Sequence, residues 1–426
     1  MTTPSIPALS IERHRLENGL EVVLHSDHSL PLVAVNLWYH VGSKNERPGR
    51  TGLAHLFEHM LFQGSENVGT NDHFRLVQQA GGVANGSTWF DRTNYYETMP
   101  ANYLDLALWL ESDRMGFLLP ALDQEKLENQ RSVVMNERRE RIDNQPYGRA
   151  FERIHELLYP EGHPYHWPVI GYMDDIAGAS LEDVEAFFRA HYTPNNSVLT
   201  LAGDFDAEEA MERVDHFFSP VPPGQPTSLL AAPPLGDRSR RREVMEDDVE
   251  LARIYLASTV PAFGEDDWYA VDLLATVLSG GKSSPLYADL VYSQQLATDV
   301  SAFVLPTEIA ATFMLVATAR PGTDIEALEL ALNRHLAAIA KEGPSEADLG
   351  RARNKVITAL SDQYQKLDQR ADLLSMFTTY FDDPHRLQQE LETYLELDRE
   401  DLARVADHYL QTDAQVSLAI VAKSKS

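Results

Sequence analysis

The chain has 426 residues, no cysteine and a formal net charge of −29 at pH 7. Its hydrophobic content of 43% can bury about two or three cores, which argues against a disordered protein. The lack of cysteine excludes disulfides and thiolate metal sites. The negative charge argues against nucleic-acid binding and would attract cationic partners, although solubility is its simpler explanation.

The first half of the chain predicts an alternation of strands and helices. Strand-like segments at residues 20–25 and 32–41 precede a helix at 52–63, and a helix-loop-strand stretch then continues to residue 97. Two long helical segments follow, the second of them a charged helix at about 123–143. Three further elements close this half: a helix at 181–192, a strand at 197–202 and a helix at 207–218.

The second half repeats this order after a proline-rich stretch, which predicts an extended linker. The ends of the two halves match best, because a helix, a His-Tyr pair and a strand occur at His191-Tyr192 and again at His408-Tyr409. A duplicated α+β domain is the natural interpretation. We therefore predict a catalytic domain at 1–218, a linker at 219–243 and a homologous non-catalytic domain at 244–426. The elements expected in the second half are strand 252–259, helix 268–279, helix 285–294, strand 302–304, strand 311–317 and strand 416–420.

A metal-binding motif lies in the helix expected at 52–63. His55 and His59 are four residues apart, so both imidazoles would lie on one face of the helix with Glu58 beside them. Thr51 is the expected N-cap, and Gly64 the expected stop. The composition predicts roughly 0.08 such H-x-x-[DE]-H matches by chance. The alternative is a pair of capping or core histidines on an amphipathic helix.

The order of residues in this motif is typical of the inverzincins, which invert the commoner H-E-x-x-H zinc motif. A catalytic zinc site needs a third protein ligand and leaves its fourth position open. Glu137, on the charged helix, is the candidate. Without further context it is only one of many helical glutamates.

Four segments together resemble the pitrilysin and insulin-degrading enzyme family, which includes the mitochondrial processing peptidases. They are the motif at 55–59, Val133-Val134-x-x-Glu137, Gly-His-Pro-Tyr at 162–165 and Tyr-x-Pro-Asn-Asn at 192–196. The similarity spans nearly the whole chain, and its size suggests the short, two-domain bacterial members. The resemblance implies two homologous α+β domains, each a mostly antiparallel sheet with helices packed on one face.

The resemblance also implies a zinc metalloendopeptidase. Zn²⁺ would be bound by His55, His59 and Glu137, and Glu58 would be the general base that activates the zinc-bound water against short or unfolded peptides. Zinc itself is an inference from the family, because nitrogen and carboxylate ligands would also accept manganese or cobalt. The alternative function is a non-catalytic core or assembly subunit of the same fold, although such subunits often lose the metal motif.

The glycine-rich segment 81–91 resembles the edge strand of the family, to which the substrate adds as an extra strand. This implies that Ala84, Asn85 and Gly86 bind substrate through backbone pairing, which tolerates many peptide sequences. A glycine-rich hairpin that binds no ligand is the alternative.

The chain departs from the family pattern at three positions. Many members have a glutamate seven residues before the third ligand, where this chain has Gln130. Self-sufficient members carry an arginine and a tyrosine in the second half, where our alignment places Val291 and Thr298. This suggests the zinc-bearing subunit of a heterodimer whose zinc-less homologous partner supplies both groups, with a homodimer as the alternative. The neighbouring Tyr292 could compensate in part.

The sequence also bears on location. No segment of 18 or more residues is apolar enough to span a bilayer, and the first seven residues lack the basic and apolar parts of a signal peptide. We therefore expect a cytoplasmic protein without membrane or nucleic-acid partners, and a periplasmic one if a leader has been removed.

Overall fold

The computed structural model describes residues 9–226, 230, 233–235 and 239–423. Its contacts divide the chain into two compact units. Unit 1 contains the described residues up to Arg138, together with Trp167–Leu230 and Ser361–Gln388, and unit 2 contains the others. Each unit thus includes a segment from the opposite half of the chain. The domain borders at 218 and 243 stay a prediction. Residues 1–8 and parts of the predicted linker (227–229, 231–232 and 236–238) lie outside the described residues.

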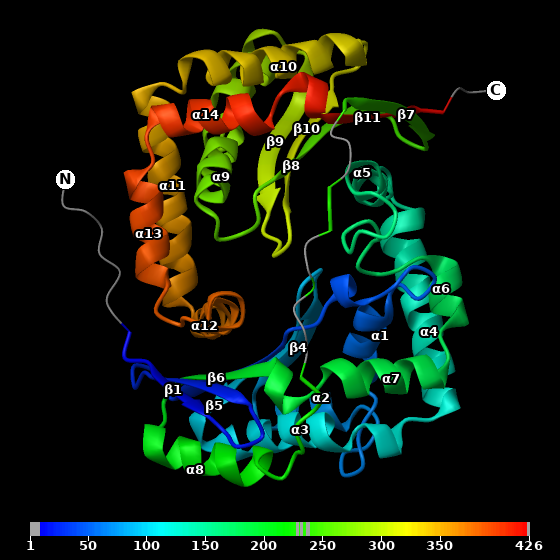
Figure 1. The fold of residues 1–426 in the computed structure, drawn as a ribbon, viewed down its shortest axis with the longest axis vertical. Coiled ribbons are helices and arrows are strands. Elements are labelled where there is room, and N and C mark those ends of the chain that lie inside the picture. The colour runs from blue at the N-terminus through cyan, green and yellow to red at the C-terminus, as the bar shows by residue number, and fades with distance from the viewer. Residues whose placement is uncertain (1–8, 227–229, 231–232, 236–238, 424–426) are drawn as a thin grey trace. The chain divides into compact units, whose positions relative to one another are not determined.

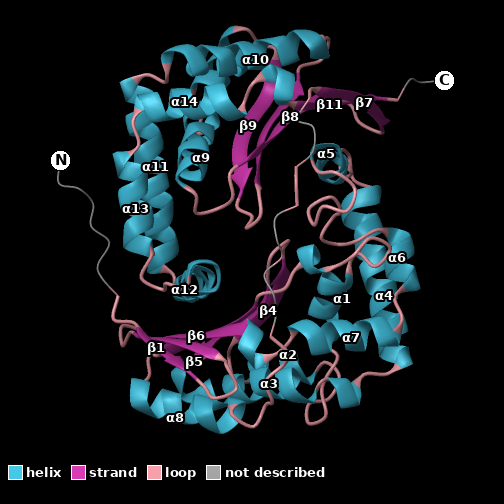
Figure 2. Cartoon of the chain, viewed as in Figure 1, coloured by secondary structure: helices cyan, strands magenta, loops and turns pink. Residues whose placement is uncertain are grey.

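Unit 1 is built on a six-stranded sheet in the order β1-β2-β6-β3-β5-β4 (Figure 2). Only the β2–β6 pair is parallel. β4 ends the sheet and pairs with β5 alone among the described strands, so one of its backbone edges stays open. The strands are β1 (Glu12–Arg15), β2 (Glu21–Ser26), β3 (Leu32–Tyr39), β4 (Val83–Thr88), β5 (Thr93–Pro100) and β6 (Ser197–Gly203).

Seven helices of unit 1 pack on one face of this sheet, because alternate strand residues such as Val35, Leu37 and Tyr39 point into a common core with them. The opposite face carries α12 (Leu367–Phe381), which lies across the sheet in Figure 1. Leu374 of α12 contacts Trp38 and other apolar residues of that face. The seven helices are α1 (Leu53–Met60), α2 (Asp72–Gln79), α3 (Leu104–Phe117), α4 (Gln124–Arg138), α6 (Met173–Gly178), α7 (Leu181–His191) and α8 (Ala207–Phe218).

Unit 2 is built on a five-stranded sheet in the order β7-β11-β8-β10-β9, in which only β7 and β11 are parallel. One face packs on α9 (Asp266–Ser279), α10 (Ile325–Glu342) and α14 (Arg399–Tyr409). The opposite face meets α5 (Ala150–Leu158) and the residue that follows it, Tyr159, whose hydroxyl lies 2.8 Å from Thr312 Oγ1. The strands are β7 (Arg241–Asp247), β8 (Arg253–Val260), β9 (Ala297–Leu305), β10 (Ala311–Ala319) and β11 (Val416–Ala422).

Two further helices, α11 (Glu346–Gln365) and α13 (Leu387–Glu396), precede and follow α12 in the chain. π-helical turns occur at Arg139–Asp143 and at Tyr287–Ser293, where the sequence predicts a helix. None of the helices in the described residues is both long and apolar enough to cross a membrane. The predicted class, two α+β halves with mostly antiparallel sheets and helices on one face, is confirmed. The helices on the second faces, α12 and α5, were not foreseen.

Candidate metal centre

The helix that carries the motif, α1, begins one residue later than predicted. Its N-cap is Gly52, whose φ of 88° lies in the left-handed region that a residue without Cβ adopts readily. The prediction of Thr51 as N-cap is wrong, because the Thr51 hydroxyl donates to Asp175 Oδ2 instead, at 2.7 Å. A carboxylate from another segment caps the helix: the two oxygens of Glu46 accept from the N–H groups of Gly52 and Ala54, both at 2.8 Å.

Three predicted ligands converge in unit 1. Nε2 of His59 lies 3.2 Å from Glu137 Oε2, and Nε2 of His55 lies 3.8 Å from the same oxygen. One ligand atom from each residue lies within 4.8 Å of the others, and all three side chains are partly exposed. The helix orients the two imidazoles by burying its other face, which includes Leu56 and Phe57.

These residues fit a divalent metal ion. Zinc–nitrogen and zinc–oxygen bonds of about 2.0–2.1 Å put the ligand atoms of a tetrahedral site about 3.3 Å apart, close to the separations of 3.2 and 3.8 Å. Two imidazole nitrogens and one carboxylate oxygen are also the donor set of a catalytic zinc site with one open position. His55, His59 and Glu137 could therefore hold zinc.

Helix α4 presents Glu137 from one side of the core. Leu127 and Val134 are fully buried on this helix, and Arg138 Nη1 donates to the carbonyl oxygen of Gly171 at 2.8 Å. Gln130, which replaces the expected glutamate, is 5% exposed. These contacts fix the helix without a second acidic residue at that position.

Glu58 lies beside the three ligands in an apolar setting. Burial raises the pKa of its carboxyl group, whereas a hydrogen bond from Thr88 and the positive charges of His59 and Arg92 oppose this shift. The hydrogen bond joins Thr88 Oγ1 to Glu58 Oε2 at 2.7 Å. A carboxyl group with a raised pKa is a stronger base, and its anchor on β4 fixes its position. Sequence reasoning missed Thr88 and Arg92 because they lie about thirty residues further along the chain.

Strand β4 passes directly beside Glu58. Of the predicted substrate-binding residues, Gly86 is buried, Ala84 is half-buried and Asn85 is exposed, and all three lie on this edge strand. A Cβ atom on Gly86 would come within 3.1 Å of Glu58 Cγ, so a larger residue there would displace the Glu58 side chain by a few tenths of an ångström. The Asn85 side-chain oxygen accepts from the Gly86 N–H at 2.9 Å. Their role in substrate binding stays a prediction.

A second polar cluster, fully buried in unit 1, was not predicted. His73 Nε2 lies 2.9 Å from Glu97 Oε1, while Arg114 binds Glu111 through two N–H groups and lies 3.7 Å from Glu97. Burial, followed by the charge of Arg114, lowers the pKa of His73 to about 3, so this imidazole is neutral near pH 7. Because Arg114 already supplies the cation, the cluster is an ion-pair network. The guanidinium of Arg114 lies 4.2 Å from the centre of the Tyr95 ring, and this ring flanks Gly86.

The two positions where an arginine and a tyrosine were expected lie in unit 2. Val291 is 6% exposed in the π-helical turn, and Thr298 Oγ1 on β9 donates to the carbonyl oxygen of Thr318 at 3.2 Å. Tyr292, the residue that could compensate, is 55% exposed, and its ring centre lies 5.4 Å from that of Tyr287. Neither position offers a guanidinium or a phenol.

Comparison with known proteins matches two family models to the chain. Residues 21–165 match "Insulinase (Peptidase family M16)" and residues 178–356 match "Peptidase M16 inactive domain". The chain is 32% identical over 404 residues to the zinc protease PqqE of Helicobacter pylori, covering 93% of this chain and 89% of that protein. It is 24% identical over 355 residues to a probable mitochondrial-processing peptidase subunit beta of Arabidopsis thaliana, covering 81% of this chain and 66% of that one.

A solved structure agrees over almost the whole chain. The crystal structure of a protease from Helicobacter pylori superposes with a TM-score of 0.91 at 30% identity, covering 97% of this chain and 100% of that chain. The likeness therefore includes both units.

Proposed function

The chain belongs to peptidase family M16, and from that premise we propose that it is a zinc-dependent endopeptidase that hydrolyses short or unfolded peptides. One observation carries the proposal: His55, His59 and Glu137 converge with the spacing of a zinc site, and Glu58 lies beside them on the same helix. The name of the relative, zinc protease, supports both the metal and the reaction.

In this mechanism His55, His59 and Glu137 hold the metal, and Glu58 handles the protons. A bound zinc ion supplies a Lewis acid that polarises the scissile carbonyl and lowers the pKa of water. Glu58 accepts the proton of the attacking water and then delivers it to the leaving amine. The open edge of β4 holds the peptide backbone as an added strand, which places a peptide bond beside Glu58.

The alternative is a non-catalytic assembly subunit of the same fold. Such a subunit has no need for three metal ligands with an acid beside them, whereas this chain brings all four groups together. The catalytic function is therefore the better supported of the two.

Replacing Glu58 by Gln tests the proposal. We expect Glu58→Gln to bind one zinc ion per chain and to lose peptide hydrolysis by a factor of about 100 or more, because the proton acceptor is removed while the ligands stay. Zinc is measured by metal analysis and turnover with a quenched fluorescent peptide library. His55→Ala is the matched control, since it should lose the metal as well. A zinc-loaded Glu58→Gln variant with substantial activity would contradict the assignment.

We further propose that the active enzyme is a heterodimer with a homologous zinc-less subunit. Val291 and Thr298 lack the arginine and tyrosine expected there, and one relative is named as a subunit of a processing peptidase. We expect weak hydrolysis by the zinc-loaded chain alone and at least tenfold more in an equimolar mixture with such a homologue. Equal activity with and without the homologue would show that the chain is self-sufficient, alone or as a homodimer.

A further inference from the structure

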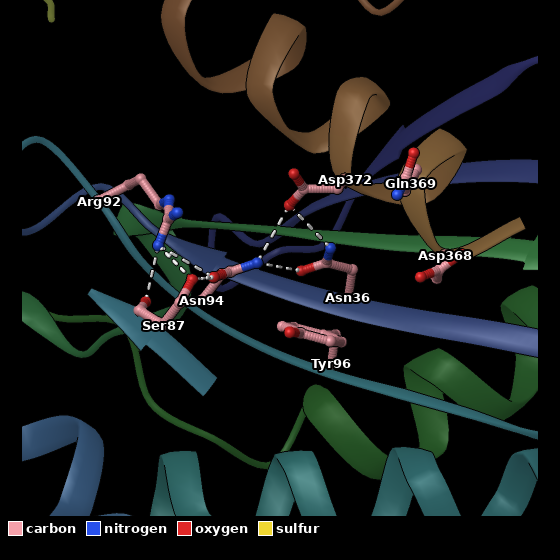
Figure 3. Close-up of a pocket in the computed structure, with 8 residues that line it drawn as sticks. All are labelled: Asn36, Ser87, Arg92, Asn94, Tyr96, Asp368, Gln369 and Asp372. Carbon is pink, nitrogen blue, oxygen red and sulfur yellow. Dashed lines mark hydrogen bonds between the residues drawn. The ribbon is translucent and has the colours of Figure 1, made fainter. Parts of the chain in front are cut away.

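A polar cavity of about 210 Å³ lies on the face of the unit 1 sheet that carries α12, opposite the candidate metal centre. We call it the α12-face cavity. β4 is shared by both sites: Gly86 and Thr88 face Glu58, while Ser87, between them, faces the cavity. The cavity is lined by Asn36, Ser87, Arg92, Asn94, Tyr96, Asp368, Gln369 and Asp372 (Figure 3).

Three charged side chains line this cavity, and two of opposite sign, Arg92 and Asp372, have one amide between them; the third, Asp368, is exposed. Arg92 Nη1 donates to Asn94 Oδ1 at 3.1 Å, and Asn94 Nδ2 donates to Asp372 Oδ1, also at 3.1 Å. Figure 3 shows Asn94 between the guanidinium and the carboxylate. Asn94 is 2% exposed, so the amide that separates the charges is held in the sheet.

Both charged groups keep unused hydrogen-bonding atoms. Asp372 Oδ1 also accepts from Asn36 Nδ2 at 3.1 Å and from Trp38 Nε1 at 2.8 Å, whereas its Oδ2 accepts from none of the described residues. Arg92 Nη1 also donates to the carbonyl and the hydroxyl of Ser87, at 2.7 and 2.6 Å, whereas its Nε and Nη2 donate to none of the described residues. Arg92 and Asp372 form no ion pair with each other there. Opposite charges left apart beside one cavity are complementary to a ligand that carries both.

The Asn94 amide indicates the size of that ligand. Its oxygen and nitrogen are bonded to one carbon, about 2.3 Å apart, and they bridge Arg92 to Asp372. In an α-amino acid the ammonium nitrogen and the nearer carboxylate oxygen are three bonds apart, about 2.7 Å. With its carboxylate at Arg92 and its ammonium at Asp372, the zwitterion would form a second bridge of the same polarity and of similar length.

We propose that the α12-face cavity binds a free α-amino acid, with the carboxylate on Arg92 Nε and Nη2 and the ammonium on Asp372 Oδ2. The proposal needs neither zinc nor peptide hydrolysis, so it stands apart from the proposed function.

The same groups fit other ligands less well. A basic side chain would meet Asp372 but also the positive Arg92. A peptide added beyond β4 would lie two strand spacings from β5, about 10 Å, which exceeds the reach of a lysine side chain. An acidic side chain would leave Asp372 unused. Only a zwitterion uses both charges.

Binding of glycine, L-alanine and L-asparagine to the full chain tests the proposal, by calorimetry and saturation-transfer NMR. We expect at least one of the three to bind, and its N-acetyl and carboxamide derivatives, which each lack one charge, to bind at least about tenfold more weakly. Derivatives that bind as well as the parent amino acid, or no binding of any of the three, would overturn the proposal.

Variants locate the binding. We expect Arg92→Gln and Asp372→Asn each to weaken binding by about tenfold or more, because each removes one charge and leaves a polar side chain, which in Asp372→Asn has the same size. Asp368→Asn is the matched control: this exposed carboxylate lines the same cavity without contacting Asn94, so its loss should change the affinity less than threefold. Thermal unfolding checks the fold of each variant. Equal losses in all three variants, or unchanged affinity in Arg92→Gln and Asp372→Asn, would overturn the opposed-charge site.

Discussion

His163 is a buried side chain that must be neutral to make its contacts. It is 1% exposed, and its Nδ1 accepts from the N–H of Tyr165 at 3.0 Å, a bond that a protonated Nδ1 cannot accept. Burial, followed by the charges of His155 and His166, lowers the pKa of His163 from 6.5 to about 4. Burial also lowers the pKa of His155 to about 4.

This shift fixes the sign of a pH effect on stability. The unfolded chain takes up a proton on His163 as the pH falls below about 6.5, but the folded chain does so only near 4, so the stabilisation is complete above pH 6.5 and falls between 6.5 and 4. His163→Asn keeps an acceptor for Tyr165 without the titration. Between pH 7 and 4.5 we expect its free energy of unfolding to fall by about 2 kcal/mol less than that of the parent chain, measured by denaturant titration. Equal falls in both proteins would contradict this account.

At the scale of elements, α1 depends on a carboxylate outside the helix. Glu46 is 8% exposed, and burial raises the pKa of its carboxyl group, while the N–H groups of Ala54 and Gly52 act against that shift. The same two N–H groups have no intrahelical partner, so Glu46 satisfies donors that would otherwise stay unbonded. His55 follows directly after Ala54, which couples this cap to the metal centre.

Glu46→Ala should therefore destabilise the protein and weaken metal binding together. We expect the free energy of unfolding to fall by about 1–3 kcal/mol, because two buried N–H groups lose their acceptor. Denaturant unfolding and a competitive zinc titration measure the two effects. Glu66→Ala, at an exposed glutamate, is the matched control and should change stability by less than about 0.5 kcal/mol. Equal effects of the two substitutions would refute the capping role.

Elements with a strong local pattern were predictable from the sequence. The helix at 207–218 matches α8 residue for residue, because its apolar spacing and the preceding Asp206 cap are local signals. β9 is longer than the strand predicted at 302–304. The prediction was too short because exposed Thr298 and Asp299 interrupt the apolar pattern of the strand. β7 was not predicted because most of its residues are charged, so its sequence lacks the apolar pattern that indicates a strand.

Some residues of the candidate site were likewise predictable from local sequence spacing, and others were not. The spacing of His55, Glu58 and His59 is local, so the sequence alone brings these residues together. Glu137 needed the family resemblance, because 77 residues separate it from His59. The contacts of Glu58 with Thr88 and of α1 with Glu46 depend on tertiary packing and leave no signal in the spacing.

At the scale of the whole molecule, the two halves of the chain exchange segments. Residues 361–388 belong to unit 1, where α12 buries Trp38 and Val198 of the sheet. Residues 139–166 belong to unit 2, where Tyr159 meets β10. Each sheet therefore has a second face that residues from the other half of the chain cover.

A chain split between residues 230 and 231 tests this exchange. We expect the fragment 1–230 alone to aggregate or to melt well below the full chain, because without α12 the apolar residues Val23, Trp38 and Val198 face water. Co-expression with 231–426 should restore a soluble pair, which thermal unfolding and gel filtration can detect. A fragment 1–230 that melts at the temperature of the full chain would show that α12 is dispensable.

The exchange also sets an order of events on the ribosome. Domains usually fold in turn as they emerge, the N-terminal one first. Here the sheet of unit 1 is synthesised by residue 203, but α12 ends only at Phe381, so the nascent chain must wait for most of the second half. During that interval Trp38 and Val198 stay uncovered by α12, and we expect chaperones to bind this apolar face of the sheet. Slow translation beyond residue 203 would lengthen that exposure rather than help the first unit to fold.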